Sequence, residues 1–158
     1  MKKLLRLALL SSIPLFIQGC GSDAVAENQV NEKSLSVIHS GMYLASGQST
    51  SKGSRVFTSK QAYESELLNY SSELPKSIDF TQSRVFLVDM GERNSGGHSI
   101  EIDGITEHDG YVLATVVLTE PGDGCMITQA ITNPFQFIEV ATTKEILIEE
   151  KIAQSSCN

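Results

Sequence analysis

RVFLVDM, residues 84–90, is a nearly continuous apolar run that contains β-branched and aromatic side chains. These residue types favour strands, and an apolar run without regular polar interruptions is typical of a strand that is covered on both faces. We therefore expect residues 84–90 to form a central strand, with the elements on either side arranged around it.

Further strand patterns follow the central run. Residues 100–103 alternate isoleucine with acidic residues, which predicts a half-exposed strand. Residues 106–110 predict a turn in which Asp109-Gly110 supplies the positive φ of a hairpin, and residues 121–124 (PGDG) predict a second turn. The remaining expected strands are residues 111–119, 126–131, 135–140 and 145–152.

One helix is expected before the central run. Its apolar side chains recur with helical spacing along one face, and they are Tyr63, Leu67, Tyr70 and Leu74. Thr58 and Gln61 have the spacing of a capping box at its start, and Pro75 marks its end. We interpret the apolar stripe as core packing.

The segment before the helix completes the expected fold. Residues 35–44 form a first strand candidate, residues 45–54 a polar loop rich in glycine and serine, and residues 55–57 lead into the helix. Several strands around one helix predict an α+β fold, mostly antiparallel, with a sandwich-like sheet and one amphipathic helix. We expect residues 35–158 to form a single globular domain, because a segment of this length supports one core.

The N-terminus carries the features of a secretory signal. Three basic residues lie among the first six, and residues 4–17 are mostly apolar, contain no acidic residue, and are too few for the roughly 20 residues of a spanning helix. Residues 17–20 (IQGC) resemble the lipobox of bacterial lipoproteins, in which the cysteine becomes the first mature residue and carries lipid. We therefore predict a signal peptide at residues 1–19 and lipidation of Cys20. The alternative is an ordinary signal peptide with a chance cysteine.

The predicted anchor and the charge restrict the partners. Gly21, rather than an aspartate, follows the cysteine, and this is similar to signals that direct Gram-negative lipoproteins to the outer membrane. Residues 20–34 are polar and predict a flexible tether. Removal of residues 1–19 takes away three basic residues, leaves 9 against 19 acidic ones, and changes the net charge from −7 to −10. We expect attachment to the membrane through lipid and no binding to nucleic acid, since an acidic domain repels phosphate backbones.

Two cysteines remain besides the predicted lipid site. In the oxidising compartment outside the cytoplasm, an even pair most simply forms a disulfide, so we predict a bond between Cys125 and Cys157. The rival interpretation makes Cys125 a catalytic thiol, but no paired base stands out in the sequence.

The loop after the central strand is the main candidate for a binding site. It carries two adjacent glycines inside a polar turn, which permit positive φ and a close backbone approach. The candidate partner-binding residues are Arg93, Asn94, Ser95, Gly96, Gly97 and His98. The alternative is a bulged connection between two strands that binds nothing.

This loop also carries a family resemblance. Residues 85–140 resemble the C-terminal domain of the PrcB family, whose members are accessory subunits or stability proteins of bacterial surface protease complexes. The family pattern places Gly-x-Lys-x-Thr-Gly-Gly-Tyr between an apolar and an alternating strand, followed by a hairpin strand and a Pro-Gly loop. The chain supplies Gly91, Gly96-Gly97, residues 99–102 and Pro121-Gly122. It departs from the pattern with Arg93, Ser95 and His98 in place of Lys, Thr and Tyr.

The resemblance implies a non-catalytic module that docks on another envelope protein, for example a protease. A protease inhibitor that resembles chagasin is the alternative, because such inhibitors also present glycine-containing loops of a β-sandwich, and an enzyme is a third class. Ser95 and His98 are too close in sequence to indicate a hydrolase pair. His39, His98 and His108 lie in different segments without metal-ligand spacing, so we predict no catalytic residues, no metal and no cofactor.

Overall fold

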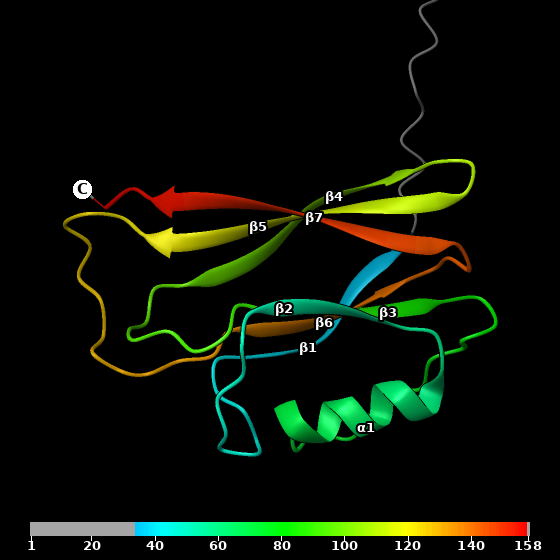
Figure 1. Cartoon of the computed structure of the whole chain (residues 1–158), viewed down its shortest axis with the longest axis horizontal. Coiled ribbons are helices and arrows are strands. Elements are labelled where there is room, and N and C mark those ends of the chain that lie inside the picture. Colours follow the sequence, from blue (N-terminus) through cyan, green and yellow to red (C-terminus); the bar gives the residue numbers. More distant parts are fainter. Residues whose placement is uncertain (1–33, 158) are drawn as a thin grey trace, which may run out of the picture.

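The computed structural model describes residues 34–157, which form two β-sheets and one helix (Figure 1). The predicted signal peptide, Cys20 and all of the predicted tether but Ser34 lie outside the described residues. The helix, α1, spans Lys60–Tyr70. The strands are β1 (Leu35–Gly41), β2 (Gly53–Phe57), β3 (Arg84–Asp89), β4 (Ser99–Glu107), β5 (Tyr111–Pro121), β6 (Phe135–Val140) and β7 (Glu145–Ser155).

The two sheets and the helix are stacked in three layers. One sheet has the strand order β1-β6-β3-β2 and the other β4-β5-β7. The sheets lie face to face, and α1 covers the other face of the four-stranded sheet (Figure 1). Neighbouring strands are antiparallel except for β5 and β7, which run parallel. The fold is α+β and mostly antiparallel, as the sequence predicted.

All of the run RVFLVDM except Met90 forms β3, which lies between β2 and β6 as a central strand. Val85 and Leu87 pack in the cluster beneath the helix, whereas Phe86 and Val88 face the three-stranded sheet. None of these four side chains is more than 3% exposed. Because both faces of β3 are covered, these four interior positions require apolar side chains, which explains the run from Val85 to Val88.

The start of α1 differs from the prediction by one residue. Ser59 is the N-cap, in an extended conformation, and its hydroxyl accepts a hydrogen bond from the amide of Ala62 at 3.4 Å. The capping box predicted from Thr58 and Gln61 is therefore wrong. Ser59 is an equally good cap by residue type, and it directly precedes the first helical residue.

The end of α1 also comes earlier than predicted. The helix stops at Tyr70, and Leu74, expected on the apolar stripe, is 87% exposed. Ser71 is the C-cap, and its hydroxyl accepts a hydrogen bond from the amide of Glu73, a local bond that competes with continued helix. The other members of the stripe are buried, as predicted: Tyr63, Leu67 and Tyr70.

Residues 126–131, predicted as a strand, lie within the described part of the chain and form no strand. Their neighbour is the connection between β3 and β4, which is itself irregular, so no ladder can form. The amide of Gly96 donates to the carbonyl of Thr128 at 3.0 Å, and one isolated bridge joins Arg93 to Thr132. Met126, at 102% relative exposure, and Ile131, at 63%, confirm that this apolar segment does not enter the core.

Smaller differences concern the remaining boundaries. β1 ends at Gly41 instead of residue 44, and residues 53–54, assigned to the loop, belong to β2. β4 and β7 are longer than predicted, and β7 reaches Ser155. Within residues 34–157, α1 is too short and too polar to cross a membrane.

Candidate partner-binding site

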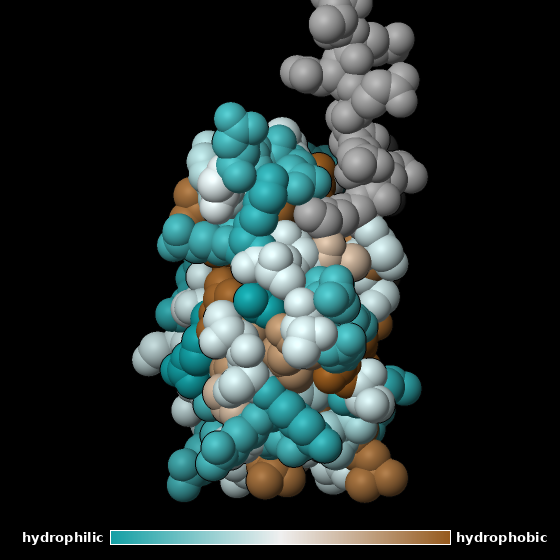
Figure 2. Space-filling view, turned by 90° about the vertical axis from the view of Figure 1, so that its right-hand side faces the viewer, coloured by the Kyte–Doolittle hydropathy of each residue, from teal (hydrophilic) through white to brown (hydrophobic). Residues whose placement is uncertain are grey.

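Three connections meet at one end of the molecule. They are the β1–β2 loop (residues 42–52), the β3–β4 loop (residues 90–98) and the β5–β6 segment (residues 122–134). All three lie on the left in Figure 1, at the end where α1 also finishes. At the opposite end, which faces the viewer in Figure 2, hydrophilic and hydrophobic residues are interspersed without one broad hydrophobic area. Loops on a rigid scaffold commonly carry recognition, so the end that carries the three connections is the candidate site.

A buried carboxylate holds these connections together. Asp89, the last residue of β3, is 2% exposed. It accepts hydrogen bonds from the hydroxyl of Tyr70 at 2.7 Å, the amide of Gly91 at 2.7 Å, the side-chain amide of Asn133 at 2.6 Å and the hydroxyl of Thr50 at 2.5 Å. Each donor comes from a different element: α1 or one of the three connections. A buried carboxylate is tolerated only when it is well hydrogen bonded, so this network fixes how the connections sit.

The same network shifts the titration of Tyr70. Burial raises the pKa of Tyr70 well above its usual value, and the neighbouring Asp89 carboxylate, which accepts a hydrogen bond from its hydroxyl, raises it further. The tyrosine therefore stays protonated and keeps donating its hydrogen bond at any physiological pH. Gly91 has a positive φ of 73°, and a Cβ at this position would lie 2.5 Å from the backbone nitrogen of Lys52. The turn after β3 thus requires glycine.

The β3–β4 loop contains all the predicted partner-binding residues, and the structure distributes them unevenly. Asn94 and Gly97 are exposed, Arg93, Ser95 and His98 are half-buried, and Gly96 is buried. The glycines of this loop therefore serve close packing more than free presentation.

The buried part of the loop is fastened to the β5–β6 segment. The backbone of Arg93 exchanges two hydrogen bonds with Thr132, at 2.8 and 2.9 Å, and the hydroxyl of Thr132 donates to the carbonyl of Ser95 at 2.9 Å. Gly96 leaves no room for a side chain because Thr128 lies against it. The guanidinium of Arg93 faces the carboxylate of Glu120 at 3.6 Å.

His98 closes the loop beside a small cavity of about 190 Å³ between β1, β4 and β6. Its Nδ1 is buried and has no hydrogen-bond partner among the described residues, and the same holds for Nε of Arg93 and the side-chain oxygen of Gln136. Burial lowers the pKa of His98, the positive charge of Arg93 lowers it further, and Glu120 acts in the opposite direction. The imidazole is therefore neutral at pH 7.

A disulfide anchors the N-terminal part of the β5–β6 segment. Cys125 and Cys157 are bonded, with Cα atoms 5.1 Å apart. The bond joins the start of the segment to the chain just after β7. Cys125 is thus committed to a covalent bond and does not provide a free thiol.

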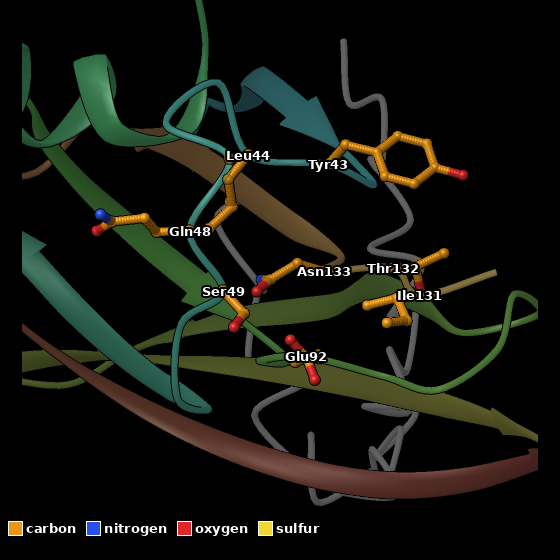
Figure 3. Close-up of a pocket in the computed structure, with 9 residues that line it drawn as sticks. Tyr43, Leu44, Gln48, Ser49, Glu92, Ile131, Thr132 and Asn133 are labelled. Carbon is orange, nitrogen blue, oxygen red and sulfur yellow. The ribbon is translucent and has the colours of Figure 1, made fainter.

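A groove of about 310 Å³ opens between the three connections (Figure 3). Tyr43 and Ile131 stand at its mouth with 67% and 63% of their surfaces exposed, and Leu44 is partly buried against the cluster beneath the helix. In Figure 3, Glu92 lies across the groove from Tyr43, with Ile131 and Thr132 between them. The polar residues of the lining are Gln48, Ser49, Glu92, Thr132 and Asn133.

Residues 85–141 match the model of the PrcB C-terminal family. This segment of the chain is similar to the PrcB C-terminal domain. The resemblance inferred from the loop motif is thereby confirmed. No curated protein and no solved structure matches the chain.

The matched segment extends from the second residue of β3 to the residue after β6. It contains the β3–β4 loop, the β5–β6 segment, Asp89 and Asn133. Tyr43, Thr50 and Tyr70 lie outside the matched segment, so the groove is built by that segment together with residues that precede it.

Sequence reasoning missed the groove and the Asp89 network. One signal was available, because Asp89 is the only charged residue inside the apolar part of RVFLVDM, and a carboxylate in a doubly covered strand must be hydrogen bonded. Tyr43 and Ile131 gave no such signal, since single apolar residues in loops are common.

Proposed function

We propose that this chain is a lipid-anchored, non-catalytic accessory protein of the cell envelope, placed in the outer membrane, that binds and stabilises a partner such as a protease. The PrcB C-terminal domain supports the accessory role, because this family points to association with protease complexes. The signal-like N-terminus and Cys20 support the lipid anchor.

The observation that carries the binding role is the rigid groove. Three connections from different parts of the chain are held at one end by a single buried carboxylate, and they leave exposed apolar side chains at the groove mouth. Loops on a rigid scaffold commonly carry recognition. An exposed tyrosine beside an aliphatic side chain is typical of a contact that is desolvated on binding.

The surroundings of the reactive side chains support a non-catalytic role. His39 is hydrogen bonded through Nδ1 to Glu73 at 2.9 Å and through Nε2 to the hydroxyl of Tyr63 at 2.8 Å, so both ring nitrogens are occupied in the core. His108 stacks on Tyr111 with ring centroids 4.4 Å apart. Cys125 is in a disulfide. Within residues 34–157, no group of three or more His, Cys, Asp or Glu side chains is arranged to hold a metal ion.

Nothing in the geometry favours the chagasin-like alternative. Such an inhibitor requires a free loop, whereas the glycine pair of the β3–β4 loop lies against the β5–β6 segment. Gly96 is bonded to Thr128, and Gly97 lies close to Ile127 and Pro121.

Cross-linking in intact cells, followed by purification of the tagged chain from membranes, tests the proposal. We expect one envelope protein to be recovered in stoichiometric amount, and its half-life to shorten when the chain is deleted. An Asn94→Arg variant, changed at an exposed residue of the β3–β4 loop, should fold normally and show whether the contact reaches this loop. Recovery of no specific protein, or turnover of a substrate by the purified chain, would contradict the proposal.

A further inference from the structure

The groove has a charge that the described part of the chain does not neutralise. Glu92 is exposed, it is the one charged residue in the groove lining, and its carboxylate has no ion-pair partner among residues 34–157. The two basic residues of the adjoining loops are engaged elsewhere. Lys52 pairs with Glu150 at 2.7 Å, and Arg93 faces Glu120 at 3.6 Å.

We propose that the groove binds an extended peptide segment of the partner, in which a lysine or arginine lies next to an aliphatic residue. The cationic side chain pairs with Glu92, and the aliphatic one packs between Tyr43 and Ile131. This inference rests on the proposed function and specifies the chemistry of the partner.

The size of the groove favours side chains over a cofactor. Its volume of about 310 Å³ lies at the lower limit of small-molecule sites, which range over roughly 300–1,000 Å³. The mouth is open rather than enclosed, since Tyr43 and Ile131 are both more than half exposed. One aliphatic and one cationic side chain fit such a space.

The polar lining suits a peptide backbone. The side chains of Gln48 and Ser49 on one wall can donate and accept hydrogen bonds, and both residues are exposed. On the opposite wall, hydrogen bonds fix both the side chain and the backbone of Asn133. Its side chain bonds to Asp89 and Thr50, and its backbone N–H donates to the carbonyl of Met42 at 2.7 Å. A wall that is already ordered loses little conformational entropy when a peptide binds.

The test uses fluorescently labelled heptapeptides of one sequence, with leucines on either side of a central lysine, arginine, glutamine or glutamate. Anisotropy titrations with the full-length protein in detergent should rank the lysine and arginine peptides above the glutamine peptide, and the glutamate peptide last. Glu92→Gln should weaken binding of the lysine peptide about two- to fivefold, the range of exposed ion pairs. The same substitution should leave the glutamine peptide unaffected.

Two further variants complete the test. Ile131→Ser should weaken all four peptides about threefold or more, because it removes the apolar contact. Glu101→Gln, at an exposed carboxylate on β4 outside the groove, is the matched control and should change nothing. Equal affinity for the four peptides, or no binding of the lysine peptide, would overturn the inference. The proposed function is judged separately, because a cross-linked partner can be recovered whichever peptide the groove prefers.

Discussion

The carboxylate of Asp89 accepts a hydrogen bond from the side-chain amide of Asn133, 44 positions further along the chain, at 2.6 Å. Both residues are buried, and the hydroxyl of Thr50 lies within hydrogen-bond distance of both. Asp89 ends β3 and Asn133 comes shortly before β6, so the contact joins the β3–β4 loop to the β5–β6 segment, and Thr50 adds the β1–β2 loop. The shape of the groove therefore depends on this one carboxylate.

Replacing Asp89 by alanine should destabilise the protein strongly. The change leaves the Tyr70 hydroxyl, the Gly91 amide and the Asn133 amide without their acceptor in a buried site. We expect a loss of about 2–4 kcal/mol in the free energy of unfolding. Urea denaturation followed by circular dichroism measures it.

Asp103→Ala is the control for this prediction. Asp103 is an exposed aspartate that pairs with Lys151 at 3.2 Å on the surface, and its removal should cost less than about 1 kcal/mol. If the two variants are equally stable, the Asp89 network does not organise the three connections.

Tyr70 should make the protein sensitive to alkali. Unfolded tyrosine ionises near pH 10, whereas burial and Asp89 raise the pKa of Tyr70 in the folded protein. The unfolded state therefore loses the proton first, so the stability that Tyr70 contributes is complete below about pH 10 and is lost as pH rises towards the folded pKa. Unfolding free energies measured between pH 8 and 11 should decline.

Tyr70→Phe should flatten this decline, although it removes a hydrogen bond and lowers stability at neutral pH by about 1 kcal/mol. Some alkaline sensitivity should persist in the variant, because burial also raises the pKa of Tyr63. An unchanged slope in the variant would show that Tyr70 titrates alike in the folded and unfolded states.

Local pattern predicted the layers of this fold, because they depend on which faces are covered. The run RVFLVDM indicated a doubly covered strand, and the spacing of Tyr63, Leu67 and Tyr70 indicated the face of the helix that packs. Residues 126–131 have a comparable apolar content but no strand beside them, and a strand requires a partner that local sequence does not reveal.

The groove was beyond prediction for a related reason. Tyr43 and Ile131 are far apart in sequence. They line the same groove because β1 pairs with β6, which brings the loop after β1 close to the segment before β6. The glycine pair did indicate the β3–β4 loop, since glycine at close approaches is a local requirement. Which residues of that loop are exposed depends on the packing of Thr128 and Thr132, which lie in another connection.

Changing Cys20 to alanine should block the predicted lipid modification. The expected product is an unprocessed precursor, because signal cleavage before this cysteine requires the lipid-modified thiol. Metabolic labelling with a fatty acid and fractionation of the membranes measure both effects. A variant that is processed normally would indicate an ordinary signal peptide.

Reducing the disulfide should loosen the groove before it unfolds the domain. Cys125 and Cys157 close a loop with a sequence separation of 32, and removing such a link costs about 3–4 kcal/mol on the chain-entropy model. The freed segment carries Ile131 and Thr132, which line the groove, whereas the Asp89 network still holds its other end at Asn133. A Cys125→Ser/Cys157→Ser variant should therefore keep its circular dichroism spectrum, unfold at a lower urea concentration, and exchange the amide hydrogens of residues 122–131 faster than those of β3 and β6. Exchange that increases uniformly over all strands would show that the disulfide supports the whole domain, and exchange that does not change would show that the segment is held without it.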